Sequence, residues 1–473
     1  MIPRIVPTPL GPVPPVAERS PARVAAGVLE AVLPGPGRDR LSRGEVLVVT
    51  TGQQPALFTG PLYTVYKALS AVALARRLER ERGVPVVPVF WVAGDDHDFA
   101  EANHATFLNA AGEAFRLVLR ERPAAAPSSP SYRERCGPEI AAALEQLRAG
   151  SPETEFKPGV LDWLAAAFQP SASIADAAAT ALQALLGPLG LAVLRPYQES
   201  FKREMAGYVL QALDQTLADG LSPALVEASL GRDRLKPEGS GFVSRRSGDR
   251  YTRDDLERIA AATPERLSPN VLLRPVVEAA LLPTVAYLGG PGELAYLPQA
   301  APLYQRLGVP AQTPVPRWSG VLVESRVDKV LERYQLQLGD LAGTPGPLEA
   351  RLVRASLPGP VEAALAGLRE TLGRDYQGLA AAVKAMDPTL ERTVETARNA
   401  ALGGIQDIEK KLLASLKRNN ETLVGQVVRA RAAIYPEGEP QERVLTYASF
   451  AIRYGPSLLD GLADEVARAF AAS

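Results

Sequence analysis

The chain contains few of the residues that carry metal, redox or disulfide chemistry. Its 473 residues include one cysteine, two histidines and three methionines. The single cysteine, Cys136, cannot form a disulfide within the chain. Because Arg135 and Gly137 flank it in a polar stretch, we interpret it as incidental rather than nucleophilic. Both histidines, His97 and His104, fall in one short segment, so any imidazole chemistry must come from there.

The chain also lacks a surplus of charge of one sign and any long apolar run. Its 52 basic and 53 acidic residues leave a formal net charge of −1, which argues against nucleic acid or an anionic membrane as its partner. No stretch approaches the ~20 apolar residues of a membrane span, and the Pro-rich start has no signal-peptide core. With 46% hydrophobic residues, the sequence predicts a soluble, cytoplasmic globular protein.

The pattern of the first hundred residues predicts a βαβ unit. Residues 46–50 and 84–92 are β-branched, apolar runs typical of buried parallel strands, and residues 62–82 carry apolar side chains at helical spacing between them. Thr59 is expected to cap this helix and Gly83 to end it. A βαβ unit favours a right-handed crossover. The sequence therefore predicts an α/β fold with a Rossmann-like parallel-sheet core.

Later patterns complete the expected domain organisation. Apolar runs at 191–196, 284–288 and 310–323 predict further core strands. Apolar residues at three- and four-residue spacing across 360–433, broken near Asp387, predict an antiparallel coiled-coil hairpin that dimerises. The expected parts are a discontinuous core (1–110 and 187–325), a helical connecting insertion (111–186), a second small insertion (231–270), a helical coiled-coil domain (326–435) and a C-terminal segment (436–473).

The first candidate site follows the first strand. Glycines let the backbone approach a ligand closely, and free N–H groups at a helix start favour carboxylate or phosphate. Neither the Walker A loop nor the G-x-G-x-x-G fingerprint is present, and an ordinary polar βα loop is the alternative. The candidate anion-binding residues are Gly52, Gln53, Thr59, Gly60, Tyr63 and Lys67.

The second candidate site follows the second strand, and ligands of open α/β sheets bind at such carboxyl ends. We expect His97, Asp95 and Asp98 to act as general base and amine-orienting groups, and Asp96, Asn103 and His104 to contact substrate. A metal site is one alternative, but seven helical residues would separate the two imidazoles by about 10 Å. A capped helix start with exposed acids is the other.

A third candidate site is the Gly-rich turn after residues 284–288. Such a turn can bind an anion, although alone it is a weak signal. A guanidinium farther along the chain could reach the same cleft. The residues concerned are Gly290, Gly292, Glu293, Tyr296 and Arg317.

Together these segments resemble one family, the bacillithiol-biosynthesis cysteine-adding enzymes (BshC). The resemblance rests on TGQQ (51–54), LFTGPLYTVYK (57–67), VFWVAGDDHDFAEANH (89–104), GGPGELAY (289–296) and PQER (440–443). These segments span almost the whole chain, and the second and third are long and specific. Asp96 departs conservatively from the glutamate expected there.

The resemblance implies properties that composition and spacing do not. It implies a Rossmann-like core of the nucleotidyltransferase and class I synthetase type, with a coiled-coil domain that forms a homodimer. It implies a carbon–nitrogen ligase that joins cysteine to the amine of glucosaminyl malate in the last step of bacillithiol biosynthesis. The cosubstrate stays open at this point: ATP or ADP is one candidate, no signature equivalent to the second ATP-binding motif of class I synthetases is present, and no metal is implied.

Two other classes of function remain open at this point. One is a metal-dependent hydrolase or deacetylase that uses His97 and the neighbouring aspartates. The other is a catalytically inactive coiled-coil adaptor.

Overall fold

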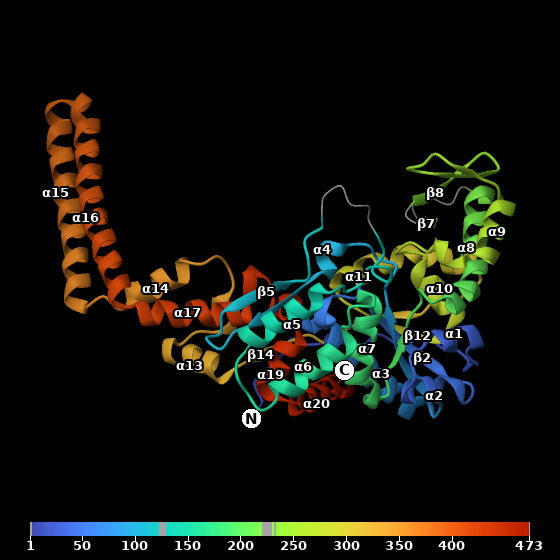
Figure 1. Cartoon of the computed structure of the whole chain (residues 1–473). Coiled ribbons are helices and arrows are strands. Elements are labelled where there is room, and N and C mark those ends of the chain that lie inside the picture. The colour runs from blue at the N-terminus through green and yellow to red at the C-terminus, as the bar shows by residue number, and fades with distance from the viewer. Residues whose placement is uncertain (1, 123–128, 220–228, 231–232, 473) are drawn as a thin grey trace. The chain divides into compact units, whose positions relative to one another are not determined.

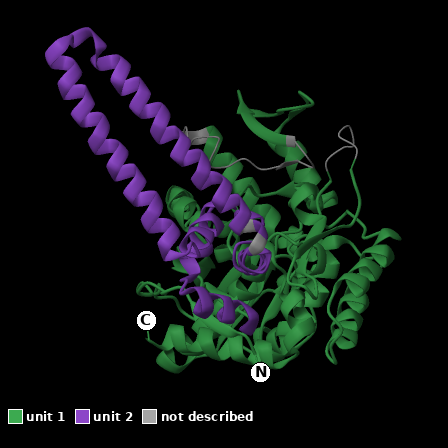
Figure 2. Cartoon of the chain, turned by 90° about the vertical axis from the view of Figure 1, so that its left-hand side faces the viewer, with its two compact units in different colours: residues 1–324, 439–473 green, residues 325–438 purple. Residues whose placement is uncertain are grey.

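The computed structural model describes residues 2–122, 129–219, 229–230 and 233–472. They form two compact units, one of residues 1–324 and 439–473 and one of residues 325–438 (Figure 2). None of the described helices is both long and apolar enough to cross a membrane.

The first unit is built on a five-stranded parallel sheet, which confirms the predicted Rossmann-like α/β core. Its order is β13-β12-β2-β3-β6, so β2, the first strand of this sheet along the chain, lies in the middle. Figure 1 labels β2 and β12. The strands are β2 (Leu47–Gln53), β3 (Val86–Val92), β6 (Ala192–Leu194), β12 (Thr284–Gly289) and β13 (Thr313–Pro316).

Helices cover both faces of this sheet because its central strands carry apolar side chains on both faces. Helix α3 (Leu62–Arg82) packs against β2 and β3 and is backed by α20 (Ser457–Ala472). The other face packs with α1 (Ala26–Ala31), α8 (Glu199–Asp219) and α10 (Arg274–Leu281). The predicted βαβ unit is confirmed, and Gly83 ends α3 in the left-handed conformation with φ of 67°.

Two local predictions are wrong. Thr59 does not cap α3, because it has φ of 72° and the N-cap is Pro61. Residues 310–323 are not one core strand. After β13 the backbone N–H of Trp318 turns to donate to Ser70 Oγ, and β14 (Gly320–Val323) then pairs with β1 (Arg4–Pro7) in a separate antiparallel sheet.

The connecting segments of the first unit carry the remaining elements. Between β3 and β6 lie the short helix α4 (Phe99–Ala102), an unpredicted antiparallel hairpin of β4 (His104–Leu108) and β5 (Ala114–Val118), and the expected helices α5 (Glu139–Gly150), α6 (Lys157–Ala167) and α7 (Ile174–Leu186). Between α8 and α10 lies an antiparallel sheet of β7 (Ser229–Leu230), β8 (Asp233–Glu238), β9 (Gly241–Ser244), β10 (Arg250–Tyr251) and β11 (Leu267–Ser268), with α9 (Arg253–Ala262).

Short helices fill the rest of the first unit. They are α2 (Pro36–Ser42), α11 (Pro291–Tyr296), α12 (Ala301–Arg306), α18 (Gln441–Val444) and α19 (Tyr447–Tyr454). Cys136 is buried in a hydrophobic cluster beneath this unit's helical insertion, and burial raises the pKa of its thiol to about 11. This placement fits a packing role.

The second unit is helical and contains the predicted hairpin. Helices α15 (Gly359–Met386) and α16 (Glu391–Asn419) run side by side, and the chain reverses at Asp387 as predicted (Figures 1 and 2). The other helices of this unit are α13 (Ser325–Tyr334), α14 (Pro347–Ala355) and α17 (Glu421–Ile434).

Candidate active site

A cavity of about 1100 Å³ opens at the carboxyl ends of β2, β3, β12 and β13, where ligands of open α/β sheets bind. Most of the residues predicted from the sequence line it. They are Gly52, Gln53, Tyr63, Lys67, Asp95, Asp96, His97, Gly290, Gly292, Glu293, Tyr296 and Arg317. Three segments that are far apart in the sequence therefore meet in one place.

Tyr63 and Lys67 of α3 line the cavity, but the residues just before this helix do not. Thr59 and Gly60 are buried beside it and are absent from the cavity lining. The first backbone N–H of α3, at Leu62, donates to the carbonyl of Leu445 at 2.8 Å. The C-terminal segment thus covers the helix start that was expected to hold an anion.

Asp98, Asn103 and His104 also lie outside the cavity lining, each with a local partner. The Asp98 carboxylate caps α4 by accepting from the Glu101 N–H at 3.1 Å. Asn103 Nδ2 donates to Arg120 O at 3.1 Å, and His104 Nδ1 lies 2.9 Å from Ala100 O.

His97, by contrast, lines the cavity. It is exposed, and its Nδ1 lies 3.3 Å from the Asp95 carbonyl. The two histidines therefore do not share a site. Within the described residues, no three His, Cys, Asp or Glu side chains are grouped so that they could hold a metal ion.

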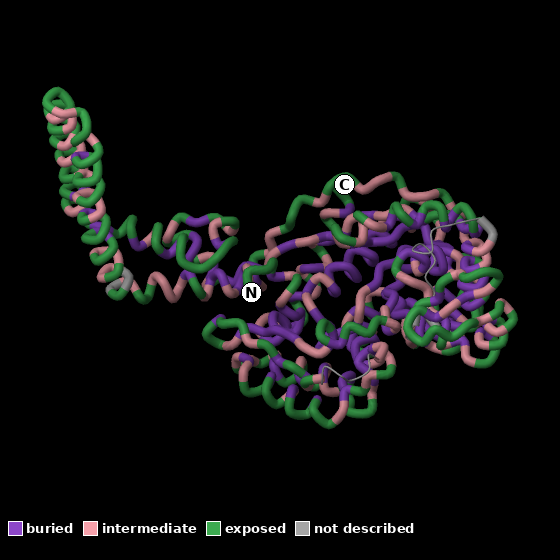
Figure 3. Tube along the Cα trace, turned by 90° about the horizontal axis from the view of Figure 1, so that it is seen from above, coloured by how far each residue is buried: buried purple, intermediate pink, exposed green. Residues whose placement is uncertain are grey.

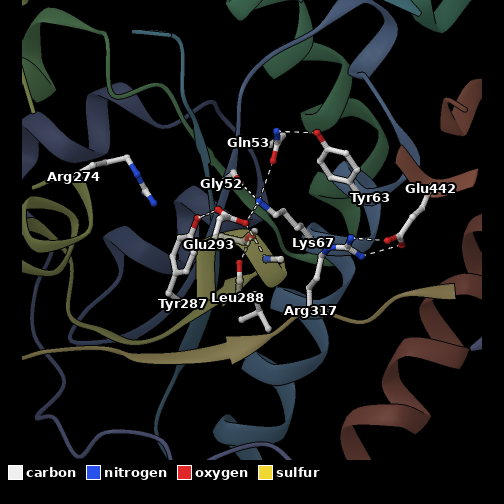
Figure 4. A network of polar contacts seen from close by, with 12 residues as sticks. Gly52, Gln53, Tyr63, Lys67, Arg274, Tyr287, Leu288, Glu293, Arg317 and Glu442 are labelled. Carbon is white, nitrogen blue, oxygen red and sulfur yellow. Dashed lines mark hydrogen bonds and ion pairs between the residues drawn. The ribbon is translucent and has the colours of Figure 1, made fainter. Parts of the chain in front are cut away.

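A buried ion pair between Lys67 and Glu293 crosses the floor of the cavity (Figure 4). Lys67 Nζ donates to Gly52 O at 2.8 Å, to Gln53 Oε1 at 2.9 Å and to Glu293 Oε2 at 2.5 Å. Glu293 also accepts from the Tyr287 hydroxyl at 2.5 Å and the Gly290 N–H at 2.9 Å. The turn after β12 is thus tied to the end of β2 through side chains.

These contacts affect the ionisation of both partners. Burial lowers the pKa of Lys67 to about 8, although Glu293 opposes this effect. Burial alone would raise the pKa of Glu293, but the Lys67 ammonium and the hydrogen bonds that it accepts hold the pKa below its ordinary value. Both groups are therefore charged at neutral pH, and Lys67 loses its charge as the pH rises, whereas Glu293 keeps its charge.

Two further cations on the cavity floor are each paired with a glutamate. Arg274 Nη1 donates to the fully buried Glu278 at 2.9 Å, and its guanidinium lies 5.6 Å and 5.1 Å from the ring centroids of Trp91 and Tyr287. Thr50 Oγ1 donates to the same glutamate at 2.5 Å. Burial raises the pKa of Glu278, and Arg274 opposes that rise.

The third pair joins Arg317 to Glu442. Arg317 donates through Nη1 and Nη2 to the two carboxylate oxygens at 2.9 and 2.6 Å, the bidentate geometry that arginine favours. Its guanidinium also lies 5.6 Å from the ring centroid of Tyr63. The C-terminal segment, which also supplies Arg443 to the lining, thus completes one wall of the cavity.

Asp95 is held by a lysine that the sequence did not reveal. Lys202 of α8 is fully buried, and its Nζ donates to the two Asp95 oxygens at 2.9 and 2.7 Å and to Ser268 Oγ at 2.8 Å. In sequence Lys202 reads as one charge on the polar face of a helix. Its contact with Asp95 spans 107 residues, so no local pattern could have identified it.

The cavity carries more positive than negative charge. Among the described residues that line it, nine are lysine or arginine and five are aspartate or glutamate, whereas the whole chain has a net charge of −1. The basic residues missed by the sequence analysis are Arg133, Arg234, Arg245, Arg246, Arg266, Arg274 and Arg443. The Arg-rich composition of residues 231–255 was the only local signal for some of them.

Comparisons with known proteins agree on one family. Residues 38–228 and 224–318 match the model described as "Bacillithiol biosynthesis BshC, N-terminal Rossmann-like domain", and residues 320–469 match "Bacillithiol biosynthesis BshC, C-terminal coiled-coil domain". Relatives from Salinibacter ruber and Symbiobacterium thermophilum, both named "Putative cysteine ligase BshC", are each 32% identical. The alignments cover 88% and 90% of this chain and 80% and 83% of the relatives.

Solved structures are much less similar. A methionyl-tRNA synthetase from Mycobacterium tuberculosis is 11% identical over 89% of this chain and 93% of its own, with a TM-score of 0.26. That score is too low to support a conclusion about either protein.

Proposed function

This chain belongs to the BshC family of bacillithiol biosynthesis proteins, and from that premise we propose that it is a ligase that joins L-cysteine to the amine of glucosaminyl malate. The reaction forms an amide and is the last step of bacillithiol biosynthesis. The observation that carries the proposal is the positively charged cavity at the carboxyl ends of the sheet, because malate contributes two carboxylates.

The reaction needs one set of groups to bind the malate carboxylates and another to bind the attacking amine, and different parts of the cavity offer them. The carboxylates of the malate group need guanidinium or ammonium partners, and the floor offers Arg274 and Arg317 beside Lys67. The attacking amine needs acidic or neutral acceptors, and the loop after β3 offers Asp95, Asp96 and His97. The amine would therefore lie near this loop while the malate group lies on the floor.

In this arrangement His97 is the general base. Its exposed imidazole can accept a proton from the attacking amine, whereas both oxygens of Asp95 are engaged by Lys202. Asp95 is thus suited to holding the amine in position, and His97 to removing its proton.

We also propose that the second unit forms a homodimer through its hairpin. Leu368, Leu379 and Ile408 on α15 and α16 are 46%, 49% and 51% exposed. Large apolar side chains repeated along a helical hairpin are typical of a surface that packs against another helix pair.

Deletion of the gene tests the proposed reaction directly. The deletion strain should accumulate glucosaminyl malate and lose the thiol, and the wild-type gene should restore both. The His97→Asn variant should restore thiol formation at a rate lower by a factor on the order of 10²–10⁴, the usual contribution of a general base.

His104→Asn is the matched control, since His104 lies outside the cavity lining. It should restore the thiol at wild-type levels. Normal glucosaminyl malate in the deletion strain would refute the proposed reaction. Full thiol levels from the His97 variant at equal protein abundance would refute only the role of His97.

A further inference from the structure

A buried lysine stands behind the carboxylate that faces the substrate amine. Lys202 of α8 is fully buried and does not line the cavity, whereas Asp95 lines it and is 28% exposed in its side chain. Lys202 Nζ lies 2.9 and 2.7 Å from the two Asp95 oxygens. A ligand in the cavity can therefore contact Asp95 on one side while the ammonium holds it from the other. The proposed reaction as described above assigns no role to this lysine.

The position of the Lys202 ammonium is fixed by several acceptors. Besides the two Asp95 oxygens, its Nζ donates to Ser268 Oγ at 2.8 Å and lies 3.4 Å from Leu267 O. Ser268 Oγ in turn donates to Asp95 Oδ1 at 3.2 Å. Helix α8, strand β11 and the loop after β3 thus meet at this point. The geometry keeps a positive charge within hydrogen-bond distance of Asp95.

Other groups close to Asp95 do not supply a positive charge of this kind. Burial raises the pKa of Tyr132 and of Tyr197, and the negative charge of Asp95 adds to the rise, so both phenols are neutral at neutral pH. The next acid in the loop, Asp96, is exposed to solvent, which weakens its interactions with other charges. Within the described part of the chain, Lys202 is the cation paired with Asp95.

The charge next to an attacking amine affects its reactivity. An amine attacks a carbonyl carbon through its lone pair, and an ammonium ion has none. A carboxylate without a counter-charge favours the ammonium form of a neighbouring amine, because an opposite charge raises the pKa of that amine. A carboxylate that is paired with a lysine still accepts a hydrogen bond, but it favours the ammonium form less. Such a pair can hold an amine without holding its extra proton.

We propose that Lys202 is a positioning residue that acts through Asp95 and keeps the substrate amine in its neutral, nucleophilic form. This inference rests on the proposed function, because that reaction brings an amine to Asp95. The hydrogen bonds of Lys202 fix the Asp95 carboxylate, and its charge prevents Asp95 from holding the amine as an ammonium ion. His97 remains the acceptor of the proton that the attacking nitrogen loses.

Calorimetric titration of the full-length protein with two ligands tests the proposal. One is glucosaminyl malate, and the other is glucosyl malate, in which a hydroxyl replaces the amine. At slightly acidic pH the free sugar amine is an ammonium ion, so the ratio of the two affinities measures the preference for the cation. Lys202→Gln keeps a donor toward Asp95 but removes the charge, and the ratio should rise at least about tenfold, which corresponds to one pKa unit of the bound amine.

The opposite substitution should shift the ratio the other way. Asp95→Asn leaves the Lys202 ammonium without its carboxylate, so it should bind glucosaminyl malate less well relative to glucosyl malate than the wild type does. A mere loss of packing would weaken the binding of both ligands together. If only one of the two variants is folded, the direction of its shift still decides.

Thiol formation in the deletion strain gives a second measurement that a purely structural role would not explain. Lys202→Gln should restore the thiol at a rate at least about tenfold below the wild type, because about tenfold less of the bound amine is neutral. This loss should occur although the variant binds the amine substrate more tightly. Lys202→Arg keeps the charge and should bring the ratio and the rate back toward the wild type.

Lys157→Gln is the matched control. Lys157 of α6 is also a buried lysine, with its Nζ 2.5 Å from Glu153 Oε1 and 3.3 Å from Ser151 O, and it does not line the cavity. This variant should keep the wild-type ratio of affinities. Melting temperatures of all variants identify those that are folded.

Three results would overturn the role of Lys202. They are an unchanged ratio in Lys202→Gln, shifts in the same direction in Lys202→Gln and Asp95→Asn, and a wild-type rate of thiol formation from Lys202→Gln. No binding of either ligand by the wild type would overturn it too and would count against the proposed reaction as well. The gene-deletion test does not depend on these ratios, so Lys202 can be misassigned while the proposed reaction stands.

Discussion

The cavity and the helical hairpin differ in their ion pairs: those of the cavity are largely buried, and most of those of the hairpin are exposed. At the cavity, charged side chains are largely buried, and two of the ion pairs join residues far apart in sequence: Lys202 with Asp95, 107 positions apart, and Lys67 with Glu293, 226 positions apart. In the hairpin, Leu365 is the one buried residue of α15, and most ion pairs are local and exposed. Figure 3 shows the difference: many buried residues run through the first unit, whereas the hairpin is mostly exposed or intermediate.

The comparison shows where charge stabilises this protein. A buried charge that loses its partner is left without water or a counter-charge, which is costly, whereas an exposed charge exchanges its partner for solvent. The same kind of substitution should therefore have very different effects in the two regions.

The largest expected effect comes from breaking the floor pair. Lys67→Met should lower the free energy of unfolding by about 3 kcal/mol, because it leaves the carboxylate of Glu293, only 21% exposed, without its ammonium partner. Guanidinium denaturation followed by tryptophan fluorescence measures this unit alone, since Trp91, Trp163 and Trp318 all belong to it.

Lys384→Met is the counterpart in the hairpin. Lys384 and Glu391 are 3.0 Å apart, and their side chains are 59% and 41% exposed. The midpoint of unfolding by circular dichroism should stay within error for this variant. Equal losses of stability in Lys67→Met and Lys384→Met would show that the burial of an ion pair does not decide how much it stabilises this protein.

A double substitution tests whether a second copy of the chain covers the exposed apolar surface of the hairpin in solution. Leu379→Glu together with Ile408→Glu should weaken dimerisation by at least about a hundredfold, since each dimer would bury both residues twice. Light scattering at micromolar concentration should report a monomer.

Gln406→Glu, which adds a charge at an exposed position of α16, is the control and should stay dimeric. A monomeric wild type at the same concentration would contradict the proposed dimer.

The smallest expected effect is a pH dependence of malate binding that is caused by Lys67 on the cavity floor. Because burial lowers the pKa of Lys67 to about 8, its positive charge is present below that pH and lost above it. An anion binds better beside the charged form, so malate affinity should fall roughly three- to tenfold between pH 7 and pH 9.5.

Lys67→Arg keeps its charge across this range, so its malate affinity should change little with pH when both proteins are measured by calorimetric titration. Identical pH profiles for the variant and the wild type would assign the titration to another group.

The contrast between local contacts in the hairpin and long-range contacts at the cavity also explains which features could be predicted from the sequence. The hairpin, its break at Asp387 and the helix α3 depend on local periodicity, so their positions were predicted well. The strand ends also indicated Lys67, Asp95 and Glu293 as members of three separate candidate sites, and the structure brings all three to one cavity because parallel strands end at one edge.

Residues that act through distant partners could not be predicted in this way. Glu278 reads as a solvent-facing charge on a short helix, yet it is fully buried because Arg274, Thr50 and Gln312 surround it. Arg234, Arg245 and Arg246 lie in a segment with weak periodicity, and only the tertiary fold brings them to the cavity. Thr59 resembled a helix cap, but it has a positive φ, the cap is Pro61, and the first N–H of α3 donates to the carbonyl of Leu445.

The pairing of Arg317 with Glu442 also constrains the order of events during synthesis. A ribosome that adds ~5–20 residues per second reaches residue 442 on the order of ten seconds after residue 317. During that interval the sheet strands and the floor pair of Lys67 and Glu293 are already available, while the wall made by the C-terminal segment is not. The nascent chain therefore passes through a stage in which its central sheet can form but its cavity stays open on the side of α18, and the entire hairpin is made before the cavity can close.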